Sequence, residues 1–178
     1  MNKLSKIVVG IALSSAMFAG QTMAAQQGTL GSTSTGKSTV TLEIADVVKI
    51  TGVDDIALGA FDGINDLDGG TAFCVYRSGG NGYTMTVSAE GKTALEVASA
   101  TTLDTIGFTA KVDSDNDASD GTAIVHNGTS GTYSGSSALD CGSTDNASLA
   151  VNFAAADLLS ASAAADYTAT VVILVEPI

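Results

Sequence analysis

Basic residues, histidine and proline are scarce in this sequence of 178 residues, and tryptophan is absent. It holds seven lysine and arginine residues against 19 aspartate and glutamate residues, and its formal net charge is −12. A chain this negative repels phosphate groups, so its composition argues against binding to nucleic acid or to anionic lipid. With little lysine or glutamate for solvated helices, and with 20 glycines for turns, the composition predicts a chain rich in β-structure.

The shortage of titratable side chains also argues against an enzyme. His126 is the one histidine of the sequence, and it stands beside an Asn-Gly turn as an expected exposed loop residue, without a partner motif for acid–base or nucleophilic chemistry. Two cysteines without a Cys-x-x-Cys spacing cannot fill a tetrahedral metal site with it. No glycine-rich stretch follows a strand and opens a helix, so the glycines are assigned to turns. We expect no catalytic residue, no metal site and no cofactor.

The first 24 residues have the organisation of a signal peptide. Lys3 and Lys6 precede an apolar run over residues 7–19, and residues 22–24 supply a small-residue cleavage pattern. The apolar run is shorter than the roughly 20 residues that a helix needs to span a bilayer. Export to an oxidising compartment makes a disulfide between Cys74 and Cys141 the expected state of the two cysteines.

Alternating apolar and polar residues predict a series of short strands after a small, polar leader. The alternation is clearest in residues 38–45, where Val40, Leu42 and Ile44 share one face. Further strands are predicted at residues 47–50, 56–61, 71–77, 83–91, 105–113, 122–126, 148–153 and 167–178. Residues 79–82 predict a hairpin turn, and the alanine-rich residues 154–166 predict at most one or two helical turns. The last strand is the most apolar, which favours a central, well-covered position.

Short strands separated by turn residues, without a lasting helical period, predict an antiparallel β-sandwich. The strand at residues 38–45 is joined to the next by only Ala45 and Asp46, which is too short a link to fold back easily. We therefore expect this strand to leave its own domain and pair elsewhere. The alternative is an ordinary edge strand that pairs within its own domain.

Three segments of the sequence carry a resemblance to a known family. They are S-T-V-T-L-E-I-A at residues 38–45, V-V-K-I-T-G-V-D-D-I-A-L-G at residues 47–59, and D-Y-T-A-T-V-V-I-L-V at residues 166–175. Their layout resembles the bacterial chaperone–usher pilins, above all the archaic and alternative branches with the spore-coat-U-like secreted pilins. The chain departs from the commonest pattern in its mid-chain cysteines and in Glu176, Pro177 and Ile178 after the closing strand.

The resemblance implies an all-β fold, an incomplete immunoglobulin-like antiparallel β-sandwich that lacks its last strand and is completed by a donor strand. Residues 1–24 would be the signal peptide, residues 25–45 the flexible leader and donor strand, and residues 46–178 the pilin domain. The donor side chains would be Val40, Leu42 and Ile44. The acceptor groove would be walled by Val48, Ile50, Val171, Ile173 and Val175.

The implied function is that of a structural fimbrial subunit that polymerises by donor-strand complementation and supports surface adhesion or biofilm formation. Its partners would be copies of itself or related pilins, a periplasmic chaperone and an outer-membrane usher, with no nucleic acid. The protein would travel through the periplasm to a fimbrium at the cell surface. A second function class remains open, a monomeric secreted module that binds carbohydrate or depends on calcium.

Two further alternatives concern particular segments. Residues 33–40 could be the donor, with residues 41–50 as the first strand. Asp113, Asp115, Asp117 and Asp120 resemble a calcium loop, but Ala118 stands where that loop needs glycine and Ile124 where it needs a bidentate acid. A solvated acidic loop is the favoured interpretation.

Overall fold

The computed structural model describes residues 25–178, apart from the side chain of Ala118; the predicted signal peptide at residues 1–24 lies outside them. The chain divides into two units, Met1–Glu43 and Ile44–Ile178. In the described part of the first unit, the backbones of Gln26 and Lys37 form a two-bond antiparallel bridge with N···O distances of 3.0 and 2.9 Å. The side chains of residues 25–43 are exposed.

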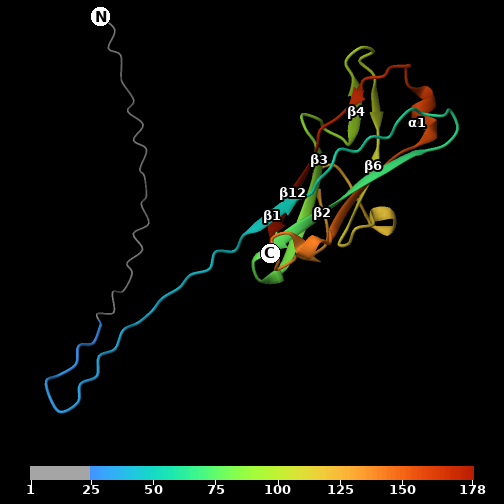
Figure 1. Cartoon of the computed structure of the whole chain (residues 1–178). Helices are drawn as coiled ribbons and strands as arrows, with labels where there is room; N and C mark the ends of the chain where they lie inside the picture. The colour runs from blue at the N-terminus through green and yellow to red at the C-terminus, as the bar shows by residue number, and fades with distance from the viewer. Residues whose placement is uncertain (1–24) are drawn as a thin grey trace, which may run out of the picture. The chain divides into compact units, whose positions relative to one another are not determined.

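The second unit is all-β, with strands in antiparallel sheets (Figure 1). The strands are β1 (Val48–Thr51), β2 (Leu67–Arg77), β3 (Gly82–Ala89), β4 (Glu96–Ser99), β5 (Thr105–Gly107), β6 (Thr109–Asp113), β7 (Thr122–Ile124), β8 (Gly128–Thr129), β9 (Tyr133–Ser134), β10 (Ala147–Phe153), β11 (Tyr167–Thr168) and β12 (Val171–Pro177). The largest sheet has the order β1-β2-β10-β6-β7. A second has the order β12-β3-β8, with β9 also paired to β3, and a third has the order β11-β4-β5.

The two larger sheets share one apolar core. Phe73, Val75 and Leu149 point inward from the β2–β10 side, and Met85 and Val87 point inward from β3; each of the five is at most 2% exposed. These positions follow the period-two alternation that the sequence shows, because successive side chains of a strand point to opposite faces. The expectation of a mostly antiparallel β-fold is therefore confirmed.

Most predicted elements are present, but residues 105–113 do not form one strand. They form β5 and β6, which lie in different sheets. The break falls at Phe108, whose backbone N–H donates to the carbonyl of Leu95 at 2.9 Å while its side chain stays in the core. The alanine-rich stretch forms α1 (Ala155–Ser160), a helix of six residues, as expected.

The predicted hairpin at residues 79–82 is wrong. The short 3-10 helix Ser78–Gly80 connects β2 to β3, but these strands belong to different sheets and are not paired. Gly79 and Gly80 adopt φ values of +74° and +65°, which glycine tolerates, and the connection is therefore not a tight hairpin turn. The chain thus crosses from one sheet to the other, a separation of about 10 Å in packed sheets.

The last predicted strand, residues 167–178, divides into β11 and β12, which lie in different sheets. β12 is also not central. β12 pairs with β3 alone and forms an edge of its sheet, and the side chains of Val172 and Leu174 are 41% and 50% exposed. The pattern correctly indicated apolar side chains on both faces of this strand. The pattern did not show that, among the described residues, β12 has a neighbouring strand on one side only.

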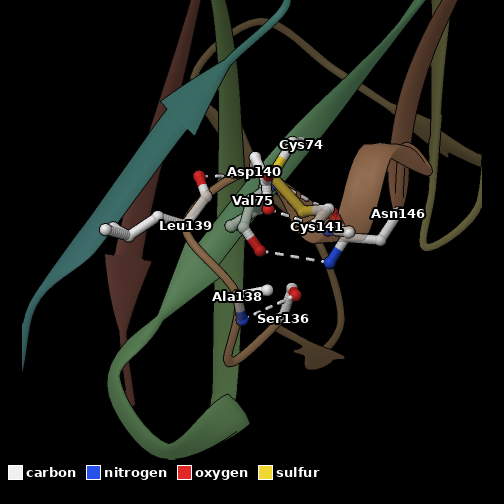
Figure 2. Close-up of a disulfide and its surroundings, with 9 residues drawn as sticks. Cys74, Val75, Ser136, Ala138, Leu139, Asp140, Cys141 and Asn146 are labelled. Atoms are coloured by element: carbon white, nitrogen blue, oxygen red, sulfur yellow. Dashed lines mark hydrogen bonds between the residues drawn. A yellow bond between two sulfur atoms is a disulfide. The ribbon is translucent and has the colours of Figure 1, made fainter.

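The predicted disulfide is confirmed. Cys74 on β2 bonds to Cys141 in the 3-10 helix Cys141–Ser143, with a Cα–Cα distance of 5.7 Å (Figure 2). Asn146 lies beside the disulfide and forms two hydrogen bonds with the backbone of Val75. Its Oδ1 accepts from Val75 N at 2.8 Å, and its Nδ2 donates to Val75 O at 3.1 Å. The amide side chain takes the place of a strand neighbour where β10 has not yet begun.

Candidate functional site

The outer edge of β12 carries unpaired backbone groups next to core-facing side chains. Thr170 O accepts from Glu90 N at 2.9 Å, and Ile178 N donates to Gly82 O at 3.3 Å, so the bonds to β3 fall at even-numbered residues. In an antiparallel pair the backbone groups of alternate residues point away from the partner strand. The N–H and C=O groups of Val171, Ile173 and Val175 therefore face the open edge, while their half-buried side chains pack on the core.

The outer edge of β1 has the same arrangement. Ser78 N donates to Val47 O at 3.0 Å, so the bonds between β1 and β2 fall at odd-numbered residues of β1. The backbone groups of Val48 and Ile50 consequently face away from β2. Both side chains are half-buried, and that of Ile50 packs on the core.

These two edges lie close to each other. Cα atoms of β1 and β12 approach within 8 Å, yet among the described strands the two are not paired with each other. A strand bonded to both would set them about 9.5 Å apart, twice the spacing of neighbouring strands. The two strands that carry the predicted acceptor residues thus lie near each other, and they must move apart before a further strand can pair with both.

Arg77 links the start of β1 to the end of β12. Its guanidinium donates to the carboxylate of Asp46, just before β1, and its Nη2 donates to the main-chain oxygen of Ile178, just after β12, at 2.8 Å. The side chain of Arg77 is 2% exposed. The hydrogen bonds from Arg77 hold the pKa of the Asp46 carboxyl below its ordinary value of 3.8.

Sequence reasoning did not select Arg77 or Asp46. The signal was present, because Arg77 continues the inward-facing series of Phe73 and Val75 on β2. A charged residue at a core-facing position needs a charged or polar partner. The identity of that partner depends on where Asp46 lies after folding.

A segment without ladder bonds covers the core beyond the end of β1. Ile56 and Leu58 pack against the core, and Asp54 N donates to Thr71 Oγ1 of β2 at 3.0 Å. The contact is close: a Cβ atom on Gly69 would lie 2.5 Å from Leu58 Cδ2 and 2.8 Å from Ile56 Cγ2. The predicted strand at residues 56–61 is therefore wrong, since this segment packs across the inner face of β2 instead of pairing with it.

The predicted donor side chains are fully available. Val40, Leu42 and Ile44 are 91%, 81% and 79% exposed, and residues 38–47 belong to no strand. This segment therefore does not act as an edge strand within its own domain. Residues 41–47 are also not part of a first strand, which begins only at Val48. Three large apolar side chains exposed at alternate positions are a typical mark of an interaction segment.

The remaining candidates lie elsewhere. His126 is half-buried and not fully exposed as expected, and its Nδ1 accepts from Ala89 N at 3.3 Å. In the acidic loop, Asp115 and Asp117 accept hydrogen bonds from the backbone N–H groups two residues further on. Within residues 25–178, no three His, Cys, Asp or Glu side chains gather in a way that could hold a metal ion. The same residues contain no helix long and apolar enough to span a membrane.

A second concave surface lies on the outer face of β2, β6 and β10, with a volume of about 630 Å³. Small residues such as Gly70 and Ala150 form its floor, and Asp68, Lys111 and Asn152 are among its polar lining. Ser148 also lines it; its side chain is 2% exposed and its Oγ has no hydrogen-bond partner. No protein-family model matches this sequence, and no curated protein matches it either.

Proposed function

We propose that the protein is a structural fimbrial subunit that polymerises by donor-strand complementation. One observation carries the proposal: a single chain combines an exposed alternating segment, with Val40, Leu42 and Ile44 on one face, and an edge strand, β12, that is apolar on both faces and open on one side. Insertion of the segment from one copy beside β12 of another would bury the exposed apolar side chains and would give the open edge of β12 a partner strand. The domain would then be an immunoglobulin-like sandwich completed in trans.

The energetics favour a durable joint. Burying each of the three donor side chains contributes about 1.5 to 3 kcal/mol, and each backbone hydrogen bond of a new ladder adds about 0.5 to 1.5 kcal/mol. Part of this gain is offset by the cost of moving β1 and β12 apart. An open apolar edge is also an aggregation hazard before assembly, so we assign its temporary cover to a periplasmic chaperone that lends a strand.

The remaining parts of the proposal follow from assembly. An outer-membrane usher would receive the covered subunit, and the polymer would stand at the cell surface as a fimbrium that supports adhesion or biofilm formation. The net charge of −12 argues against nucleic acid as a partner. We assign no enzymatic activity and no cofactor.

The test compares gel mobility of the purified exported protein in detergent with and without boiling. We expect a ladder of multimers that collapses to monomer on boiling, because only heating separates the buried strands. A variant with Leu42→Asp and Ile44→Asp should lose the ladder, since two carboxylates cannot enter an apolar groove. The matched control, Thr39→Asp with Thr41→Asp, places the same charges on the opposite face and should keep it. A monomer under all conditions would contradict the proposal.

The second candidate function is a monomeric secreted module that binds carbohydrate. It is favoured by the outer groove, where the buried Ser148 Oγ lacks a partner and polar side chains could hydrogen-bond hydroxyl groups. A monomeric protein whose amide NMR signals around Ser148 shift on addition of simple sugars, and whose Ser148→Ala variant shows no shift, would support this candidate.

A further inference from the structure

Arg77, the last residue of β2, and Ser78 after it hold the chain where it enters β1. The carboxylate of Asp46 accepts from Arg77 Nε at 3.0 Å, from Arg77 Nη2, and from Ser78 Oγ at 3.1 Å. The backbone of Val47 is bonded to Ser78 twice: Val47 N donates to Ser78 Oγ at 3.1 Å, and Ser78 N donates to Val47 O at 3.0 Å. These four residues form an anchor, and none of its bonds involves Ala45.

Arg77 gives the anchor a rigid base. It belongs to β2, which lies between β1 and β10 in the largest sheet, and its side chain is 2% exposed. Its backbone N–H donates to Ser136 O at 2.9 Å. A guanidinium that meets both oxygens of a carboxylate fixes orientation as well as distance. Asp46 is therefore held directly on β2, whereas β1 is an edge strand of only four residues.

We propose that Asp46 is a positioning residue of the assembly: Arg77 and Ser78 hold it so that one free residue joins neighbouring subunits, and the polymer is a stiff fibre. This inference rests on the proposed function and adds a mechanical property to it. In the polymer, Ile44 would be fixed in the groove of one subunit, and Asp46 would be fixed on the subunit that supplies the segment. Ala45 alone would be free to turn.

A junction of one residue restricts bending because few backbone torsions remain free. Each residue contributes only the two soft dihedrals φ and ψ. Loss of the anchor would free Asp46 and Val47 in addition to Ala45, so the junction would grow from one residue to three. A longer flexible joint allows a wider range of angles between the bodies that it connects.

The anchor also neutralises a buried guanidinium, which is a purely structural role. The two roles predict different results. Neutralisation of Arg77 affects the free energy of unfolding of one domain and leaves the bending of an intact fibre unchanged. Positioning of Asp46 affects the mobility of the chain before β1 and the stiffness of the fibre.

The first measurement is amide NMR relaxation on the non-assembling chain with Leu42→Asp and Ile44→Asp. We expect order parameters of about 0.85 at Asp46 and Val47, the value of rigid backbone. Adding Asp46→Asn removes the charge that Arg77 binds, so both values should fall below about 0.6. Adding Asp55→Asn instead removes the same charge from an exposed position and should leave both values unchanged. Rigid backbone at positions 46 and 47 in both chains would overturn the anchor.

The second measurement is the persistence length of fibres in electron micrographs. Fibres of Asp46→Asn should have a persistence length about threefold shorter than those of the unsubstituted chain, because the junction has three free residues instead of one. Ser78→Ala removes the Oγ contacts and leaves the pair of Arg77 and Asp46 in place, so it should shorten the persistence length by a smaller factor. Asp55→Asn is again the matched control and should cause no change.

The two failures are distinguishable. If the unsubstituted chain gives no heat-sensitive multimers, the proposed function itself fails. If fibres form and those of Asp46→Asn bend no more than those of Asp55→Asn, donor-strand assembly stands and the positioning role of Asp46 is wrong. A lower urea midpoint for Asp46→Asn with unchanged fibres would leave the ion pair only its structural role. If Asp46→Asn does not fold, Ser78→Ala decides, and an unchanged persistence length for that variant overturns the inference.

Discussion

The side chain of Asn146 replaces a missing strand neighbour. Its amide accepts from Val75 N and donates to Val75 O, both next to the disulfide (Figure 2). Asn146→Ala leaves the N–H group of Val75 without a partner, whereas the carbonyl of Val75 keeps its bond from Ser136 N. We therefore expect the free energy of unfolding to fall by about 1 to 3 kcal/mol, measured by urea titration. Asn146→Asp keeps the acceptor but loses the donor, so its free energy of unfolding should lie between those of the unsubstituted chain and Asn146→Ala. An unchanged midpoint for Asn146→Ala would mean that water replaces the amide at no cost.

The hydrogen bonds of Asp166 predict that the fold loses stability in acid. Its carboxylate accepts from Ser99 Oγ at 2.6 Å, from Thr101 Oγ1 at 2.8 Å and from Thr101 N at 3.0 Å. These hydrogen bonds, with Ser99 the largest contributor, lower the pKa of Asp166 from its ordinary value of 3.8. Because the unfolded carboxyl takes up protons first, the stabilisation is present above that value and is lost as the pH falls through the lowered pKa.

The corresponding measurement is the urea midpoint of unfolding as a function of pH. We expect it to fall steeply below pH 3.8, the ordinary value for the carboxyl. Asp166→Asn should be less stable at neutral pH and should lose less on acidification, since its amide does not titrate. If the variant and the unsubstituted chain lose stability in parallel, Asp166 does not contribute to the acid response; Asp46 and Asp104, whose pKa values are lowered by hydrogen bonds from Arg77 and Ser162 respectively, would then be examined in the same way.

Individual residues differ in how far the sequence could predict them. The inward positions of Tyr83, Met85 and Val87 follow from alternation, and the disulfide follows from two cysteines in a chain that is expected to be exported. The contact of Arg77 with Asp46 and Ile178 could not be predicted, because it joins three segments whose proximity depends on the complete fold.

At the level of elements, alternation predicts which residues face the core and does not predict the partner strand. Ile106, Phe108, Ala110 and Val112 all face the core, and the alternation continues unbroken across the point where the chain changes sheets. In the same way, the glycines at residues 79–82 predict a turn, but not that the chain crosses between sheets there. The open edge of β12 is likewise a property of the assembled sheets, since its sequence is that of a strand covered on both faces.

The segment that contains Ile56 and Leu58 should depend on the absence of a side chain at Gly69. Gly69→Val would place methyl groups where Ile56 and Leu58 now pack, so we expect a loss of about 1 to 3 kcal/mol in the free energy of unfolding. Amide hydrogen exchange should rise over residues 52–58 and remain low in β3 and β10. If exchange rises equally throughout the unit, the substitution has loosened the whole core and not only this segment.

For the whole molecule, the net charge controls how two copies approach each other. The full sequence carries −12 in formal charge, and loss of Lys3 and Lys6 with the predicted signal peptide makes each exported copy more negative still, so the proposed assembly requires like-charged bodies to meet. Salt screens this repulsion, because the Debye length shrinks from about 30 Å at 0.01 M to about 8 Å at 0.15 M ionic strength. The joint itself is apolar and backbone-bonded, and salt should affect it little.

We therefore expect sodium chloride to accelerate formation of the multimers while leaving their dissociation half-time nearly constant. Light scattering of purified subunits at increasing salt measures the first quantity, and timed heating in detergent at fixed salt, after assembly at different salt, measures the second. Sucrose at matched osmolarity is the control, since it does not screen charge. A rate that falls with salt would show that local charge complementarity between the meeting surfaces outweighs the overall repulsion, and that the approach of two copies is steered by specific patches rather than opposed by net charge.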